Sequence, residues 1–156
     1  LQSVHGFSSA TTVLMGGSAG GLTALNTAIS DVSLIAGVVV KYPVVDLVAM
    51  LHSDDPFEGH HMPALIGSES HAVERSPHNN AAALRDVPIL VFHGDQDHSV
   101  PLFHSERLRD AVEAVGGNIQ LEVFAGEGHG FRNPVNIARE FAVTEAFLHS
   151  LMKNAR

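Results

Sequence analysis

A serine framed by glycines directly after an apolar run is the feature that most limits how this chain can fold. The run Thr12-Val13-Leu14-Met15 is followed by G-x-S-x-G at residues 16–20, with Ser18 at the centre. That arrangement is typical of a nucleophile held on a sharp turn between a strand and a helix. We expect a strained backbone at Ser18, and we expect side chains at Gly16 and Gly20 to collide with the adjoining strand and helix.

Two later motifs add a carboxylate and a histidine, each just past a predicted strand. Asp97 follows the apolar run at 87–91, and His129 lies between glycines after the alternating stretch at 119–124. Open α/β sheets place functional groups at the carboxyl ends of their strands. The flanking glycines put His129 on an exposed, mobile loop, as a proton-shuttling base requires. The order Ser18, Asp97, His129 is that of α/β-hydrolases, unlike the chymotrypsin and subtilisin orders.

The apolar runs predict four parallel strands of an α/β fold, near 11–15, 35–41, 87–93 and 119–125. Helical patterns predict helices near 18–30, 101–115 and 134–153. In the last of these, six apolar residues recur at the spacing of a core-facing stripe: Ala138, Phe141, Ala142, Ala146, Phe147 and Leu151. Residues 52–80 lack periodicity and are expected to form short helices and loops over the active-site face.

The chain opens with Leu, and its nucleophile strand comes almost at once. A complete α/β-hydrolase has several strands before that one. We therefore expect residues 1–156 to be an incomplete α/β-hydrolase catalytic domain, corresponding to its C-terminal half with about four parallel strands and flanking helices.

Composition excludes several classes of function. A formal net charge of −8 without any cluster of Lys and Arg argues against a nucleic-acid partner. The absence of cysteine excludes a disulfide framework, a thiolate zinc site and thiol redox chemistry. No apolar run approaches the roughly 20 residues that span a bilayer, so no membrane partner is expected. An acidic chain without cysteine fits the cytoplasm, and no cofactor is implied.

The motifs together resemble the prolyl oligopeptidase family of serine peptidases, and most of all its acylaminoacyl-peptidase-like branch. The resemblance covers nearly the whole chain, and Gly-Glu-Gly-His-Gly-Phe at 126–131 is its most specific block. The other matching segments are Gly16–Gly21, Tyr42–Leu47, Glu74–Pro77 and His93–Pro101. The resemblance implies hydrolysis of a peptide or acyl-peptide bond through an acyl-enzyme, with a β-propeller that restricts substrates to short peptides; this sequence contains no propeller.

The residue roles follow from the triad chemistry and the resemblance. Ser18 is the expected nucleophile, His129 the general base and acid, and Asp97 the group that orients the imidazole. The backbone N–H of Ala19 is the expected oxyanion donor. In the family, the second donor comes from a segment upstream of the nucleophile strand, which this sequence does not include. Asp95 competes with Asp97 for the acid role; the family's His-Gly-x-x-Asp spacing selects Asp97 and leaves Asp95 to cap or brace the loop.

The resemblance also bears on specificity. Relatives that cleave after proline carry Arg or Asn two residues after the acid, and Ser99 is too short for the same contact, which argues against strict prolyl specificity. The specificity pocket of relatives corresponds here to Val44, Leu47 and Met50. These three residues line an aliphatic pocket or belong to a helix core.

Eleven histidines invite a metal hypothesis, but no H-x-x-x-H or H-E-x-x-H spacing occurs, and we expect no metal site. Loop histidines exposed to solvent are the simpler interpretation, for His52, His60, His61, His71 and His78. His93 is expected to pack or to form a hydrogen bond at its strand end. Five charged residues predict the solvated face of a helix: Glu106, Arg107, Arg109, Asp110 and Glu113. Glu127 either meets a substrate amine or braces its loop.

The sequence thus predicts a serine peptidase that acts on short peptides or acyl-peptides. The first alternative is a carboxylesterase, because the same triad cleaves esters. The second is a non-catalytic fragment that needs a partner chain, either in a homo-oligomer or with the other half of the domain. This alternative rests on the open apolar edge that the strand Thr12–Met15 would present.

Overall fold

A parallel four-stranded sheet forms the centre of the protein, in a computed structural model that describes residues 7–52 and 62–154. The strands lie in the order β1-β2-β3-β4, and every neighbouring pair is parallel. Their bounds are β1 (Val13–Gly17), β2 (Gly37–Lys41), β3 (Ile89–Gly94) and β4 (Ile119–Phe124). The predicted α/β architecture with four parallel strands is confirmed, with each strand within two residues of its predicted bounds.

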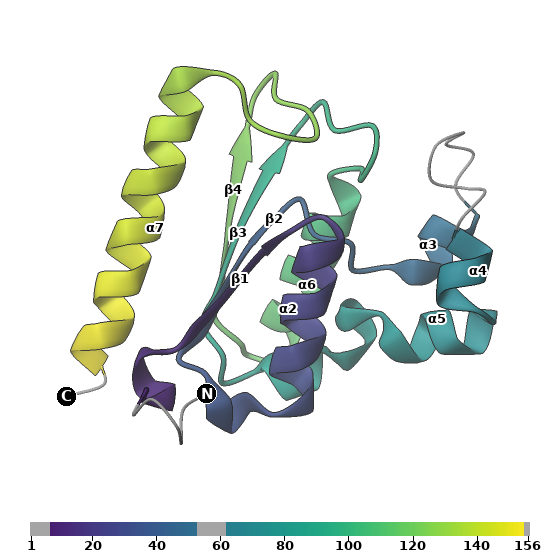
Figure 1. The fold of residues 1–156 in the computed structure, drawn as a ribbon, viewed down its shortest axis with the longest axis horizontal. Coiled ribbons are helices and arrows are strands. Elements are labelled where there is room, and N and C mark those ends of the chain that lie inside the picture. Colours follow the sequence, from purple (N-terminus) through teal and green to yellow (C-terminus); the bar gives the residue numbers. More distant parts are fainter. Residues whose placement is uncertain (1–6, 53–61, 155–156) are drawn as a thin grey trace.

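Helices cover both faces of the sheet (Figure 1). On one face α2 (Ala19–Ser30) contacts β1 and β2, and α6 (Phe103–Ala114) contacts β4. On the other face lies α7 (Pro134–Asn154), which contacts β3. The remaining elements are short and are η1 (Ser9–Thr11), η2 (Val32–Leu34), α3 (Leu47–Leu51), α4 (Met62–Ile66), α5 (Glu69–Arg75) and η3 (Pro77–Leu84). The predicted short-helix excursion is therefore present in its described part, whereas 53–61 lie outside the described residues.

Alternate side chains of the central strands enter two separate cores. Val38 and Val40 of β2 pack with Leu25 of α2 and Leu108 of α6, whereas Val39 packs on the opposite face with Leu90, Phe92 and Phe124. Because both faces are covered, β2 and β3 are buried along almost their whole length. This burial explains why these strands appear in the sequence as continuous apolar runs rather than as alternating ones.

The buried face of α7 differs from the predicted stripe. Val143 and Phe147 pack against the core that contains Phe92, and Leu151 is buried. Phe141 is 69% exposed, and the predicted positions 138, 142 and 146 are exposed as well. The apolar residues of α7 cover more than one side of the helix, so spacing alone selected the wrong side. The prediction was correct only for Phe147 and Leu151.

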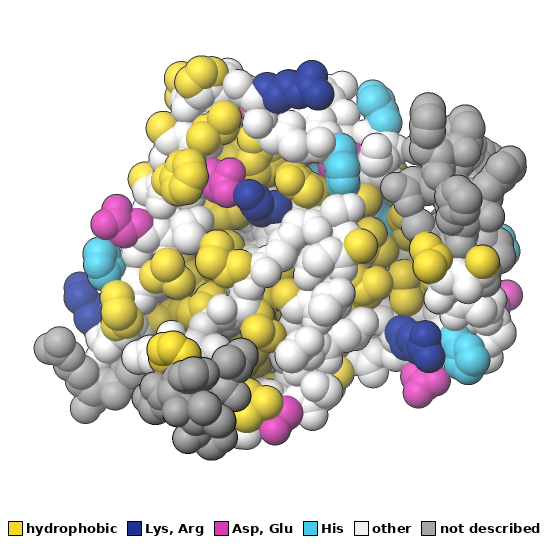
Figure 2. All heavy atoms as spheres, in the orientation of Figure 1, with side chains coloured by type: hydrophobic (Ala, Val, Ile, Leu, Met, Phe, Trp, Pro, Cys, Tyr) yellow, Lys and Arg dark blue, Asp and Glu magenta, His cyan; other side chains and the backbone are white. Residues whose placement is uncertain are grey.

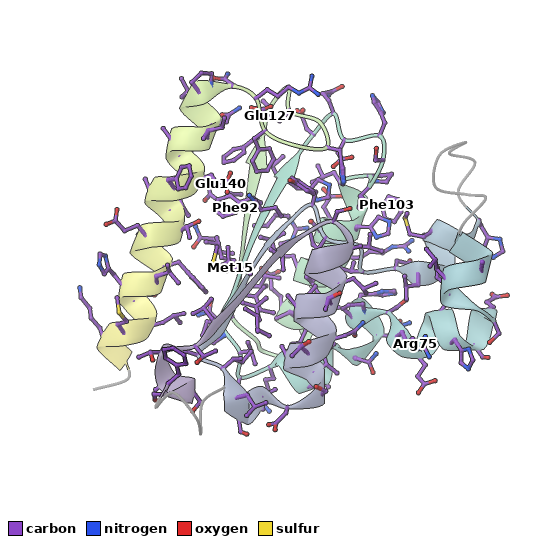
Figure 3. The ribbon with its side chains drawn as sticks, viewed as in Figure 1. Met15, Arg75, Phe92, Phe103, Glu127 and Glu140 are labelled. Atoms are coloured by element: carbon purple, nitrogen blue, oxygen red, sulfur yellow. The ribbon has the colours of Figure 1, made fainter. Side chains whose placement is uncertain are left out.

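Hydrophobic side chains are exposed beside the edge strand β1. Met15 points to the side of the sheet that faces α7 and is 59% exposed (Figure 3). A groove of about 340 Å³ runs there between β1 and α7, and Figure 2 shows apolar side chains gathered over this region. The open apolar edge expected from the sequence is thus present in the described residues.

Candidate active site

Ser18 occupies the sharp turn between β1 and α2. Its φ of 55° and ψ of −125° lie outside the ordinary regions for a residue with a side chain, as expected. A Cβ on Gly16 would stand 2.3 Å from the carbonyl oxygen of Gly20, so only glycine fits at position 16. The expected collision at Gly20 was wrong, because a Cβ there would meet open space. The collision occurs at position 21 instead, since a Cβ added to Gly21 would stand 2.8 Å from the Cβ of Pro43.

Asp97 follows β3 and is held by the loop that it starts. Its Oδ1 accepts hydrogen bonds from the backbone N–H groups of Ser99 (3.0 Å) and Val100 (2.9 Å), and its side chain is fully buried. The competing carboxylate, Asp95, is exposed, and its Oδ1 accepts a hydrogen bond from the N–H of Gly126 at 2.7 Å. Asp95 therefore braces the neighbouring loop, whereas Oδ2 of Asp97 faces His129 in the loop after β4.

His129 connects the serine to the buried acid. Its Nδ1 lies 2.8 Å from Oδ2 of Asp97, and its Nε2 lies 3.0 Å from Oγ of Ser18. The three side chains come from separate strand ends, 111 residues apart at the extremes, and meet because parallel strands end at one edge of the sheet. An imidazole between a hydroxyl and a carboxylate can accept the hydroxyl proton while the carboxylate stabilises the resulting imidazolium.

His93 lies beneath Asp97 at the end of β3. Its Nδ1 is 2.6 Å from the hydroxyl of Ser105, and its Nε2 is 2.8 Å from the carbonyl of Val100 and 3.6 Å from Oδ2 of Asp97. Burial lowers the pKa of His93, so the ring is held neutral at physiological pH. The expected hydrogen bonding of His93 at the strand end is confirmed.

Glu127 braces the loop that carries His129. Its carboxylate accepts hydrogen bonds from the backbone N–H groups of Arg132 and Asn133, both at 2.8 Å, and from Nδ2 of Asn136 at 2.9 Å. The bond from Asn136, followed by the backbone donors, lowers the pKa of Glu127. Figure 3 labels Glu127 on the loop after β4. Of the two alternatives left open by the sequence, the contacts support loop bracing.

A polar cluster behind β2 consists of Asp46, His78, His104 and Arg107. Two of its members were predicted to be solvated. Nδ1 of the buried His104 accepts hydrogen bonds from the backbone N–H groups of Val45 (3.3 Å) and Asp46 (3.2 Å). Arg107 pairs with Asp46, so it does more than solvate the outer face of α6. The expectation of a solvated loop residue was also wrong for His78, whose Nδ1 lies 2.7 Å from the carbonyl of Val45.

Two pKa values in this cluster depart from their ordinary values. Burial lowers the pKa of His104 from 6.5 to about 4. Burial acts to raise the pKa of Asp46, but the hydrogen bond from the N–H of Ala49 and the electrostatic interactions with His78 and Arg107 outweigh it and lower the pKa. His104 therefore acts as a neutral acceptor that fixes the segment after β2. This function could not be predicted from the sequence, because the partners of His104 lie almost 60 residues away.

An apolar cavity of about 210 Å³ opens beside Ala19, the residue after Ser18. Of the three expected pocket residues, Val44 and Leu47 line it, whereas Met50 is buried in the cluster behind. The remaining lining residues are Leu22, Asn26, Leu65, Ile66 and Arg75. Ser99 is half-buried, with its N–H directed at Asp97.

Within residues 7–52 and 62–154, no three histidine, aspartate or glutamate side chains form a group that could hold a metal ion. His60 and His61 of the metal hypothesis lie outside the described residues. The helices in the described part of the chain are all too short or too polar to cross a membrane.

A serine on a strained turn after β1, with an acid after β3 and a histidine after β4, defines the class: the sheet and its helices are part of an α/β-hydrolase fold. The model of the prolyl oligopeptidase family, a serine peptidase family, matches residues 3–155, and the chain belongs to that family.

Individual peptidases and an esterase are similar to this chain. A puromycin-hydrolyzing peptidase of Mycobacterium tuberculosis superposes with a TM-score of 0.89 at 29% identity, over 97% of this chain and 23% of that one. Dipeptidyl aminopeptidase BIII of Pseudoxanthomonas mexicana is 36% identical over 75 residues, which cover 48% of this chain and 11% of that protein. An isoprenylcysteine alpha-carbonyl methylesterase of Arabidopsis thaliana is 27% identical over 65% of this chain and 25% of its own length. The chain thus spans about a quarter or less of each relative.

Proposed function

We propose that this chain carries the catalytic centre of a serine hydrolase that cleaves peptide or acyl-peptide bonds through an acyl-enzyme. The observation that carries the proposal is the unbroken line of hydrogen-bonding distances from Oγ of Ser18 through His129 to Asp97. Membership of the prolyl oligopeptidase family supports the peptide class of substrate.

The reaction runs in two halves. Oγ of Ser18 attacks the acyl carbon while Nε2 of His129 takes its proton, and the resulting oxyanion accepts a hydrogen bond from the N–H of Ala19. The carbon–nitrogen bond then breaks, and His129 returns the proton to the leaving amine. Water then attacks the acyl carbon of the ester while His129 takes its proton, and the bond from carbon to Oγ breaks as His129 passes that proton to Ser18, which releases the acid. Asp97 fixes the Nδ1–H tautomer throughout.

The apolar cavity beside Ala19 is the site that we assign to the side chain on the acyl side of the scissile bond. Val44 and Leu47 supply aliphatic walls. A cavity of about 210 Å³ suits one medium-sized apolar side chain rather than an extended ligand. Met50 does not line the cavity and would affect substrate binding only by supporting Val44 and Leu47, which belong to the same buried cluster.

Labelling with a fluorophosphonate probe tests the catalytic centre directly. We expect the wild-type chain to be labelled and the Ser18→Ala and His129→Ala variants to lose labelling. Ser150→Ala and His149→Ala, on the exposed side of α7, are matched controls that should label at the wild-type rate. A folded wild-type chain that fails to label, or a Ser18→Ala variant that labels normally, would contradict the proposal.

A carboxylesterase is the second candidate, and the similarity to a methylesterase favours it. Comparing kcat/KM for an acyl-peptide anilide and a p-nitrophenyl ester with the same acyl group separates the two candidates. Ser18-dependent hydrolysis of the anilide supports the peptidase. Hydrolysis of the ester alone would overturn the peptide part of the proposal and leave the serine hydrolase in place.

A further inference from the structure

Tyr42 stands directly beside the proposed nucleophile, at the end of β2. Gly17 is opposite Lys41 in the pairing of β1 with β2, and the N–H of Ser18 donates to the carbonyl of Lys41 at 3.0 Å. Tyr42 therefore follows immediately after the residue that anchors Ser18. Neither the strand pattern nor the triad spacing assigns a function to this tyrosine.

The backbone of Tyr42 is strained. Its φ is 38°, and among the described non-glycine residues only Ser18 shares a positive φ. Such a conformation costs on the order of 1–3 kcal/mol for a residue with a side chain, and it persists only where the surroundings enforce it. Strain of this kind is concentrated at functional sites, so the contacts of the Tyr42 side chain indicate what the strained conformation achieves.

The Tyr42 ring lies against His129. The two ring centroids are 4.6 Å apart with the planes tilted by 52°. The same ring meets Phe131 edge-on at 5.5 Å, and a Cβ on Gly17 would stand 3.2 Å from its Cε2. His129 is 29% exposed and sits between glycines, so its own loop offers little to fix the plane of the imidazole. Tyr42 supplies a wall for that plane.

Tyr42 and the segment after it are restrained by three sets of contacts. Its N–H donates to the carbonyl of Phe92 at 2.7 Å. The following segment is fixed by His104, which accepts two backbone N–H groups, and by the pair of Asp46 with Arg107. The polar cluster behind β2 thus restrains the backbone that directly follows Tyr42.

We propose that Tyr42 is a positioning residue for His129, which keeps Nε2 directed at Ser18 and Nδ1 at Asp97. The inference rests on the proposed function. This positioning requires the aromatic ring, which contacts His129, and does not require the hydroxyl.

Two substitutions at position 42 distinguish the effect of the aromatic ring on kcat from the effect of the hydroxyl. We expect Tyr42→Leu to lower kcat by about tenfold or more, with KM nearly unchanged, since a small misplacement of a catalytic group is costly. Tyr42→Phe should retain wild-type kcat within about twofold, because the ring contacts remain. Phe147→Leu is the control for loss of a half-buried aromatic from α7, and it should leave kcat unchanged. Wild-type kcat in Tyr42→Leu, or an equal loss in Tyr42→Phe, would overturn the proposal.

A second measurement needs neither turnover nor a variant. Tyr42 is the only tyrosine in the chain, so selective labelling gives a single aromatic spin system. We expect nuclear Overhauser contacts between its ring protons and the imidazole protons of His129. Their absence in the folded chain would overturn the positioning of His129, whether or not the chain is active. Loss of fluorophosphonate labelling with these contacts intact would instead contradict the proposed function alone.

Discussion

Acidification should destabilise this fold through His104. The ring is 1% exposed, and its Nδ1 is used as an acceptor for two backbone N–H groups, so protonation inside the fold would lose both bonds and bury a charge. The pKa of His104 is lowered from 6.5 to about 4 in the folded state. Between these values the unfolded chain binds a proton that the folded chain does not, so stability rises with pH over this window.

The magnitude follows from the same shift. Relative to pH 7, the linkage predicts a loss of about 2 kcal/mol at pH 5 and about 3 kcal/mol at pH 4 from this one group. Other buried groups also titrate on acidification, including His93, whose pKa is lowered by burial. A matched variant is therefore needed to isolate His104.

His104→Gln provides that match, because its side-chain oxygen can accept from the same N–H groups but does not titrate. Free energies of unfolding from urea titrations at pH 7, 6, 5 and 4 give the slope for each protein. We expect the wild-type chain to lose about 3 kcal/mol more than the variant between pH 7 and pH 4. Equal pH slopes for the two proteins, or a His104 imidazole that titrates near 6.5 in NMR spectra, would refute the reasoning.

Two further predictions concern the turn and the acid. Gly21→Ala should lower the free energy of unfolding by about 1–3 kcal/mol, because its Cβ would stand 2.8 Å from Pro43, whereas Gly20→Ala meets open space inside α2 and should be neutral or stabilising. Urea titration of both variants measures this difference, and equal losses would count against the packing argument. Asp97→Asn should reduce kcat by about 10³–10⁴-fold, because an amide nitrogen facing Nδ1 favours the wrong tautomer of His129. Steady-state kinetics should show a much smaller loss in Asp95→Asn, whose oxygen braces only Gly126; comparable losses would return the acid role to Asp95.

Much of the architecture could be predicted from the sequence because its causes are local. A strand covered on both faces requires an unbroken apolar run, and β2 and β3 show such runs at 38–40 and 89–92. The turn at Ser18 needs a glycine at position 16, since the backbone of Gly20 leaves no room for a Cβ. Parallel strands end at one edge of a sheet, so motifs after three strands were expected to meet there.

The tertiary structure decided whatever depends on contacts between distant segments. Spacing showed that α7 is apolar, but the position of the sheet decided that Val143 faces it and Phe141 does not. The motif around Tyr42 was visible, yet only packing brought its ring against His129, 87 positions later in the chain. His104 looked like one more histidine on a helix until the fold directed two backbone N–H groups at it. Sequence patterns report the periodicity and turn chemistry of one segment, whereas these side chains acquire their function from partners that only the folded chain brings within reach.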